Sequence, residues 1–140
     1  MGKVIAGITT SIDGYITGPD DGPGKGLGEG GERLPFFIVT HRPEDQPEGD
    51  VFRFVDGLEN AIAAAQEAAG EKHVHVMGGA DVIRQALEAQ LVDELAIIIA
   101  PVVLGGGKRL FEGFDKTIEL EHLGVRQSPF ATFIEYRVVR

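Results

Sequence analysis

The sequence predicts a single α/β domain over residues 1–140, with a mixed, mostly parallel sheet, flanking helices and a C-terminal antiparallel strand pair. Three observations support this prediction. Short apolar runs rich in β-branched residues recur along the chain, as strands require. Two segments between them carry apolar residues spaced three and four apart, as amphipathic helices do. The last two apolar runs, 118–123 and 132–139, are joined by a short connection, which favours antiparallel pairing.

The first half of the chain supplies strands and one long loop. The runs Lys3–Thr10 and Pro35–Thr40 are apolar and β-branched, and the alternation over Val51–Val55 indicates a short edge strand. A brief extended segment, Tyr15–Thr17, follows an Asp-Gly turn signal. The stretch 18–34 is rich in glycine and lacks periodicity. So long a loop is uncommon inside a compact domain, so we expect either a lid or a missing segment.

The first predicted helix begins near Asp56. This residue and Glu59, three positions later, form an aspartate version of the capping box. Gly70 is typical of the residue that ends a helix. The predicted apolar face consists of Leu58, Ala61, Ile62, Ala65 and Ala69.

The second predicted helix lies between two strands. His73–Met77 is a strand pattern that runs into Gly78 and Gly79, and Val92–Val103 is apolar and β-branched, as a buried strand is. A strand, a helix and a strand in this order imply a right-handed unit with parallel strands. The predicted apolar stripe of the helix consists of Val82, Ile83, Ala86 and Leu87.

Composition and charge exclude several classes of function. Hydrophobic residues make up 43% of the chain and charged residues 25%, which is an ordinary globular balance. The absence of cysteine removes disulfides, thiolate nucleophiles and thiolate zinc sites. The net charge of −9 argues against nucleic-acid binding, which needs basic residues to displace counterions. No long apolar stretch predicts a membrane span and no signal-peptide pattern opens the chain, so we expect a cytoplasmic location.

Gly78, Gly79 and Ala80 stand where a predicted strand meets a predicted helix, which suits a pyrophosphate. Glycine lets the backbone approach a ligand closely, and a helix start presents unpaired N–H groups and a partial positive charge. Asp81 in the first helical turn would repel a phosphate placed too near it. Backbone N–H groups would therefore do the binding. The competing interpretation is a tight turn that binds nothing.

Thr40, His41 and Arg42 end another predicted strand. A hydroxyl, an imidazole and a guanidinium together could bind the extra phosphate that distinguishes NADPH from NADH. A solvated strand end explains the same residues without a ligand.

Other motifs are weaker. The segment 105–109 lacks the glycine spacing and the hydroxyl residue of a P-loop, and the glycines within 22–31 do not open a helix. His73 and His75 share one strand face without a third ligand, so no metal site is predicted. Ser11 and Asp13 are the nearest candidates for catalytic groups, yet no histidine partner for a hydrolase triad is evident.

Three segments together resemble the dihydrofolate-reductase-like family. The branch is that of the C-terminal reductase domain of the bifunctional riboflavin-biosynthesis deaminase/reductase. The segments are 10–20 (TSIDGYITGPD), 76–87 (VMGGADVIRQAL) and 91–111, where LVDEL leads into APVVLGGGKRLF. The third segment, with its spacing from the second, is the most specific. The likeness covers about the first thirty residues and everything from Pro35 onward.

The resemblance implies a fold that binds NADPH across the carboxyl ends of its strands. Gly78, Gly79 and Ala80 match the glycine pair that meets the cofactor pyrophosphate, and 40–42 match the strand end beside the adenosine ribose phosphate. The loop from Tyr15 onward resembles a lid over the nicotinamide. The implied reaction is hydride transfer to a carbon–nitrogen or carbonyl centre. The residues that match the first strand and turn beside the nicotinamide and substrate are Thr10, Ser11, Asp13 and Gly14.

The chain also departs from this branch. Its members carry a helix, a strand and a second helix between the lid loop and the strand equivalent to Pro35–Thr40. That block includes a Gly-Arg-x-Thr-Tyr/Phe-like motif whose Arg and Thr hold cofactor phosphates. Here Leu34 leads directly to Pro35, as in a chain with an internal block removed. We therefore expect a gap or an altered strand order, weak or absent catalysis, and exposed edges that favour a homodimer, strand-swapped in one form.

Two functions follow from these observations. The first is an NADPH-dependent reductase of a small pterin- or pyrimidine-like heterocycle, related to riboflavin synthesis. Dihydrofolate reductase and 5-amino-6-(5-phosphoribosylamino)uracil reductase are the models for it. The second is a shortened, non-catalytic relative that binds nucleotide weakly or serves as a homo-oligomeric assembly module. Cofactor-dependent stabilisation and NADPH oxidation would distinguish the first function from the second.

Overall fold

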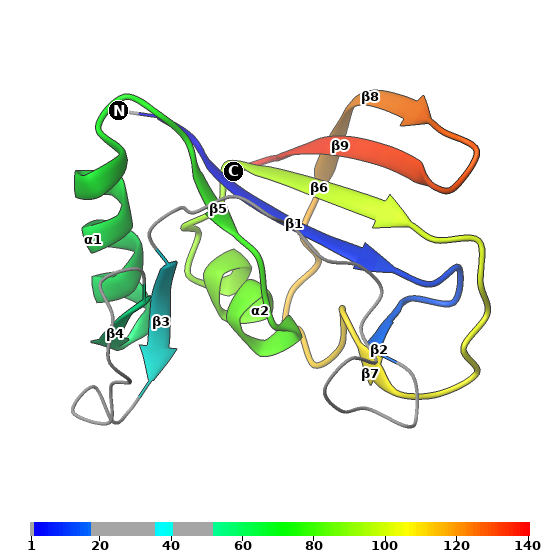
Figure 1. The fold of residues 1–140 in the computed structure, drawn as a ribbon, viewed down its shortest axis with the longest axis horizontal. Helices are drawn as coiled ribbons and strands as arrows, with labels where there is room; N and C mark the ends of the chain where they lie inside the picture. Colours follow the sequence, from blue (N-terminus) through cyan, green and yellow to red (C-terminus); the bar gives the residue numbers. More distant parts are fainter. Residues whose placement is uncertain (1, 18–35, 41–51) are drawn as a thin grey trace. The chain divides into compact units, whose positions relative to one another are not determined.

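The computed structural model describes residues 2–17, 36–40 and 52–140 (Figure 1). The chain divides into two compact units. Within the described residues, the first unit comprises 2–3, 36–40 and 52–74, and the second comprises 4–17 and 75–140.

The first unit contains a small sheet and one helix. β3 (Phe36–Thr40) pairs in parallel with β4 (Phe52–Asp56). α1 (Leu58–Ala69) packs against both strands and buries Ala61 and Ile62 of the predicted apolar face. The two strands and the helix were all predicted from the sequence, and the helix ends at Gly70 as expected.

The predicted capping box of α1 is wrong. Asp56 is the last residue of β4, and the N-cap of the helix is Gly57, with no side-chain cap hydrogen bond. Gly57 has a φ of 87°, which lets the chain leave the strand and enter the helix within one residue. The first helical bond accordingly runs from Ala61 N–H to Gly57 O, 3.1 Å.

The second unit is built on a mixed sheet of five strands in the order β5-β1-β6-β9-β8. β1 and β6 are parallel, from Ile5 opposite Glu94 to Thr10 opposite Ile99. β9 is antiparallel to both β6 and β8, so the predicted C-terminal antiparallel pair is confirmed. The strands are β1 (Val4–Thr10), β5 (Val74–Val76), β6 (Glu94–Ile99), β8 (Leu120–Gln127) and β9 (Thr132–Val138).

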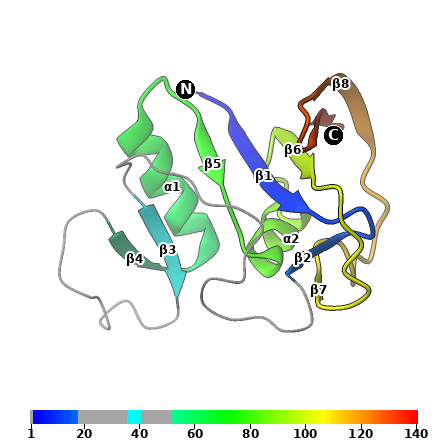
Figure 2. The same cartoon turned by 45° about the vertical axis from the view of Figure 1, so that its right-hand side comes forward.

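β5 and β1 run in the same direction. At their starts, Val74 N–H donates to Lys3 O at 2.9 Å. Further along, a Cβ placed on Gly78 would lie 3.3 Å from Ile8 Cδ1. The two strands are therefore parallel, as the arrows in Figure 2 show, and their carboxyl ends lie at the same edge of the sheet.

The core of the second unit lies on one face of this sheet. Val4 and Ala6 of β1 alternate with half-buried neighbours, as do Leu95 and Ile97 of β6, so one face is buried. α2 (Ala80–Glu88) lies beside β1 and β5 in Figures 1 and 2. It buries Ile83, Ala86 and Leu87 of the predicted stripe, whereas Val82 is half-buried.

Several predicted boundaries differ from the structure. The strand predicted to reach Val103 ends at Ile99, because Pro101 has no N–H to continue a ladder. The predicted hairpin connection 124–129 is too early: β8 runs to Gln127, and Ser128 N–H bonds to Ala131 O at 3.0 Å. β7 (Lys108–Arg109), for which the sequence predicted no element, pairs antiparallel with β2 (Tyr15–Thr17).

The small sheet of β3 and β4 is separate from the five-stranded sheet among the described residues. The gap or altered strand order expected at the Leu34–Pro35 junction stays a prediction, because both residues lie outside the described ranges. No helix in the ranges that the structure describes is long and apolar enough to span a membrane. The cytoplasmic location stays a prediction.

Candidate functional site

Two turns of the second unit follow the carboxyl ends of neighbouring strands. Residues 11–15 follow β1, and residues 77–79 follow β5. In open α/β sheets, ligands bind outside the carboxyl ends of parallel strands. The structure thus brings the candidates Thr10, Ser11 and Asp13 to the same sheet edge as the Gly78-Gly79 turn.

The turn after β1 is held by its own hydrogen bonds. Ser11 is only 1% exposed, and its N–H donates to Tyr15 O at 2.9 Å. The Ser11 hydroxyl accepts from Tyr15 N–H at 3.0 Å and donates to Asp13 Oδ1 at 2.5 Å. Gly14 N–H closes the turn on Ser11 O at 3.1 Å. Every polar group of Ser11 is therefore engaged within the turn.

Asp13 fastens this turn to a distant segment of the chain. Its Oδ1 accepts from Leu104 N–H at 3.1 Å, and its Oδ2 accepts from Gly105 N–H at 2.8 Å. Beside it, Ile12 N–H donates to Val102 O at 2.8 Å. We call this arrangement, Ser11–Asp13 with Val102–Gly105, the Asp13 clasp.

The hydrogen bonds of the clasp stabilise the charged form of Asp13. Its pKa is lowered from 3.8 to about 2, chiefly by the hydrogen bond from the Ser11 hydroxyl. Desolvation opposes this shift, and the backbone N–H groups of Gly105 and Leu104 add to it. Asp13 is therefore a carboxylate at neutral pH with both oxygens occupied. Because a general acid or base works best with a pKa near the operating pH, Asp13 is suited to fastening the turn and not to proton transfer.

The end of the same turn is anchored by β2 and β7. Tyr15 lies opposite Arg109, whose guanidinium carbon is 5.4 Å from the centre of the Tyr15 ring, a cation–π distance. Leu110 N–H donates to Gly14 O at 3.0 Å, and its side chain is 1% exposed. The residues that hold this turn thus come from 102–110, a segment in which the sequence analysis identified no partner for the turn.

The turn after β5 is open where the first turn is closed. Gly78 has a φ of 134°, and its peptide bond to Gly79 is cis. Gly79 is the N-cap of α2 with ordinary extended dihedral angles and no side-chain cap hydrogen bond. Among the residues that the structure describes, a Cβ on Gly79 would meet no atom within 4 Å. The first N–H groups of a helix lack intrahelical acceptors, so this turn offers donors beside open space.

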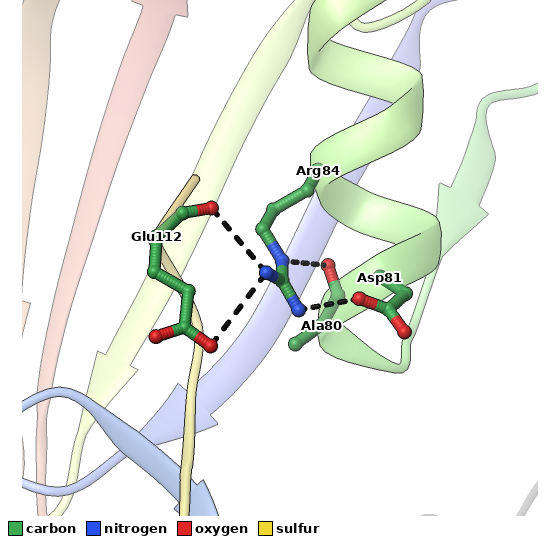
Figure 3. A network of polar contacts seen from close by, with 4 residues as sticks. All are labelled: Ala80, Asp81, Arg84 and Glu112. Carbon is green, nitrogen blue, oxygen red and sulfur yellow. Dashed lines mark hydrogen bonds and ion pairs between the residues drawn. The ribbon is translucent and has the colours of Figure 1, made fainter. Parts of the chain in front are cut away.

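Arg84 contacts the first turn of α2 and Glu112, as Figure 3 shows. Its side chain is 21% exposed and lies between Asp81, at 2.5 Å, and Glu112, whose carboxylate is 3.8 Å away. The guanidinium also donates to Ala80 O and Glu112 O, both at 3.3 Å. Arg84 therefore offsets the charge of Asp81, the residue expected to repel a phosphate.

The other predicted site residues are less informative. Thr10 is 5% exposed, and its carbonyl accepts from Ala100 N–H at 2.8 Å. Thr40 ends β3 in the first unit, while His41 and Arg42 lie outside the described residues, so the predicted phosphate trio stays a prediction. His73 Nδ1 accepts from Lys3 N–H at 2.9 Å. The described ranges contain no cluster of three or more potential metal-ligating side chains.

Comparison with known proteins gives these elements a family. Residues 30–131 match the family model described as the RibD C-terminal domain. YwjB of Bacillus subtilis strain 168, an uncharacterized protein, is 25% identical over 100 residues, which are 71% of this chain and 57% of YwjB. The chain thus matches little more than half the length of that relative.

Two solved structures share the fold. A Shewanella sp. PV-4 protein named for riboflavin biosynthesis has a TM-score of 0.79 at 21% identity, with 99% of both chains covered. The Thermotoga maritima diaminohydroxyphosphoribosylaminopyrimidine deaminase/5-amino-6-(5-phosphoribosylamino)uracil reductase has a TM-score of 0.69 at 13% identity. The match covers 99% of this chain and 57% of the Thermotoga chain. With the family model spanning most of its length, this chain belongs to the RibD C-terminal domain family and has its dihydrofolate-reductase-like fold.

Proposed function

We propose that this chain binds NADPH at the start of α2 and uses it to reduce a small pyrimidine- or pterin-like heterocycle. One observation carries the proposal: a Gly-Gly turn with open space before it joins the carboxyl end of a parallel strand to a helix. This chain also belongs to a family of riboflavin-pathway reductase domains. The name of the Thermotoga protein includes a 5-amino-6-(5-phosphoribosylamino)uracil reductase, and because uracil is a pyrimidine this favours a pyrimidine-like substrate here.

The residues at the start of α2 fit a pyrophosphate. Gly79 has dihedral angles that any residue can adopt, so its backbone does not require glycine. A missing side chain facing open space is what close approach of a ligand requires. The helix start contributes uncapped N–H donors and a partial positive charge, and Arg84 offsets the carboxylate of Asp81.

The Asp13 clasp would form a rigid wall beside the reacting ring. A bound nicotinamide supplies the hydride, and the protein's part is to position the two rings and exclude water. Ser11 and Asp13 already bond to each other, to Tyr15 and to the 104–105 backbone. We therefore assign them the role of positioning residues and not of proton donors.

A second candidate function is a non-catalytic relative that binds nucleotide weakly or assembles with itself. The engagement of Ser11 and Asp13 favours it, because Asp13 is ionised at neutral pH and the Ser11 hydroxyl proton is already donated to Asp13.

A binding titration followed by a turnover assay separates the two candidates. Quenching or enhancement of NADPH fluorescence measures binding, and loss of NADPH absorbance with pyrimidine and pterin substrates measures reduction. Saturable binding with turnover is the result that the reductase predicts. Saturable binding without turnover on any substrate favours the second candidate, and no binding of NADPH would contradict the proposed cofactor site.

A further inference from the structure

We propose that a pocket at the C-terminal end of α2 binds a small organic amine, cationic at neutral pH, that is carried on an apolar body such as an aromatic ring. The residues that line this pocket all belong to the second unit. α2 has nine residues, so its C-terminal end lies about 13 Å from the Gly78-Gly79 turn. The proposal is therefore independent of cofactor binding.

Three segments line this pocket, which we call the distal pocket: the end of α2, residues 114–119 and residues 138–140. Its volume is about 480 Å³. Small-molecule sites in proteins have volumes of roughly 300 to 1,000 Å³. The distal pocket therefore has room for a small organic molecule.

Apolar side chains from all three segments contribute to the lining. Leu87 of α2 is only 5% exposed, and Phe114, Ile118 and Val138 are half-buried. The three half-buried side chains thus leave apolar surface in contact with solvent, which a ring or an alkyl chain of a ligand would cover. Burial of apolar surface is favourable in water, so it supplies an attraction that does not depend on charge.

Carboxylates dominate the charged part of the lining. Glu88, Asp115 and Glu119 are exposed, and none of them forms an ion pair within the part of the chain that the structure describes. Lys116 supplies one opposing charge. A cleft lined mainly by one sign of charge concentrates ligands of the opposite sign. The side chains therefore favour a cationic ligand.

Arg140 also lines the distal pocket, but its guanidinium is already engaged. One of its nitrogens donates to Gln90 O at 2.8 Å and to Val92 O at 3.0 Å, and it lies 3.4 Å from Asp93 Oδ1. The last turn of α2 contains no basic residue, and the C-terminus of a helix carries a partial negative charge. The backbone thus adds to the preference for a cation over an anion.

The test is a titration of the unaltered chain with four small probes, followed by the backbone amide chemical shifts in NMR spectra. Phenethylamine carries an ammonium group and a ring, methylamine only the ammonium group, phenethyl alcohol only the ring, and hydrocinnamate a ring with a carboxylate. We expect phenethylamine to cause saturable shifts at 87–90, 114–119 and 138–140 and none at Gly78 and Gly79. The other three probes should bind at least about threefold more weakly, because each lacks one of the two attractions.

Two charge variants test the carboxylates. Replacing all three in one protein, by Glu88→Gln, Asp115→Asn and Glu119→Gln, should weaken phenethylamine binding by about tenfold, because each exposed ion pair contributes up to about fivefold. The control variant removes the same number of exposed carboxylates from the first unit and should bind phenethylamine as the unaltered chain does. Its substitutions are Glu59→Gln, Glu67→Gln and Glu71→Gln. Cooperative thermal unfolding of each variant shows that it has folded.

Four results would overturn the proposal. The first is the absence of saturable shifts around the distal pocket with phenethylamine. The second is equally tight binding of methylamine or of hydrocinnamate, which would show that the ring or the positive charge is not recognised. The third is an equal loss of affinity in both charge variants, which would reduce the effect to net charge. The fourth is binding seen only after dilution of the protein, which would show that a second copy covers the pocket.

Discussion

The two turns at the carboxyl edge of the sheet differ in composition and in what they leave free. The turn after β1 contains a serine and an aspartate, the residue types associated with catalysis, and both are consumed by internal hydrogen bonds. The turn after β5 contains two glycines with no side-chain chemistry, and its backbone donors adjoin open space. In this protein, the polar side chains of the turn after β1 therefore have a structural role. The candidate binding site is formed by the backbone of the Gly78-Gly79 turn after β5.

The largest expected effect comes from the core that supports both turns. Ile83 of α2 is completely buried, and its N–H bonds to Gly79 O at 3.1 Å. Ile83→Ala should cost about 2–5 kcal/mol of unfolding free energy, because removing the buried side-chain carbon atoms leaves a cavity. Urea unfolding measures the loss. Glu88→Ala on the exposed side of the same helix is the control, with a change of about 0.5 kcal/mol or less, and an equal loss in both variants would contradict the burial described.

The two glycines of the open turn should respond differently to alanine. Gly78→Ala places a side chain at a φ of 134° and against Ile8, which should cost about 1–3 kcal/mol of unfolding free energy. The added methyl group of Gly79→Ala meets no atom of the described residues and should change stability by less than about 1 kcal/mol. Chemical denaturation of the pair checks this difference. A larger loss of unfolding free energy in Gly79→Ala than in Gly78→Ala would contradict the open space described before α2.

The Asp13 clasp predicts an acid-sensitive contribution to stability. The folded pKa of about 2 lies below the ordinary 3.8, so the ionised carboxylate favours folding above about pH 4. This contribution is lost as the pH falls through about 2. Asp13→Asn should therefore lower Tm at neutral pH, with a gap to the unaltered chain that closes between pH 4 and pH 2.

Thermal unfolding across this pH range is the measurement. Asp115→Asn removes an exposed aspartate outside the turn and gives the baseline for losing one surface charge. A gap for Asp13→Asn that stays constant down to pH 2 would show that its carboxylate does not hold the turn.

The smallest expected effect concerns Arg84. Its ion pair with the 81%-exposed Asp81 is screened by solvent, so Arg84→Met should cost only about 1 kcal/mol of unfolding free energy. Cofactor affinity should fall more clearly, because Asp81 is then left uncompensated beside the proposed pyrophosphate site. Arg84→Lys keeps the charge and should retain most of the affinity in a fluorescence titration with NADPH. Equal affinity in all three proteins would remove Arg84 from the site.

Local sequence patterns predicted most of the fold. The β-branched runs of β1, β3 and β6 and the apolar spacings of α1 and α2 depend on neighbours within a few positions, so they are legible without a structure. The helix cap was mispredicted because Asp56 satisfies the capping pattern while belonging to β4. Whether a strand continues through a cap-like residue is decided by its pairing partner, which local sequence does not specify.

The candidate site could be predicted only in part, because local sequence does not specify long-range partners here either. The Gly78-Gly79 turn has a local signal, the meeting of a strand pattern and a helix pattern. The partners of Asp13, Leu104 and Gly105, lie about ninety positions away and act through backbone N–H groups. No side-chain pattern indicates such contacts, so the sequence offered Ser11 and Asp13 only as the nearest candidates for catalytic groups.

Thermal unfolding of the unaltered chain and of Gly79→Ala with increasing NADPH tests the central claim most directly. At about 100 times its dissociation constant, a ligand specific for the folded state adds about 2.7 kcal/mol of stability. The unaltered chain should therefore gain several degrees in Tm, and NADH should give less. Without ligand, Gly79→Ala should have nearly the same Tm as the unaltered chain. With NADPH it should show no increase in Tm, because the added methyl group occupies the open space before α2. No gain in the unaltered chain, or an equal gain in both proteins, would contradict a binding site at this turn.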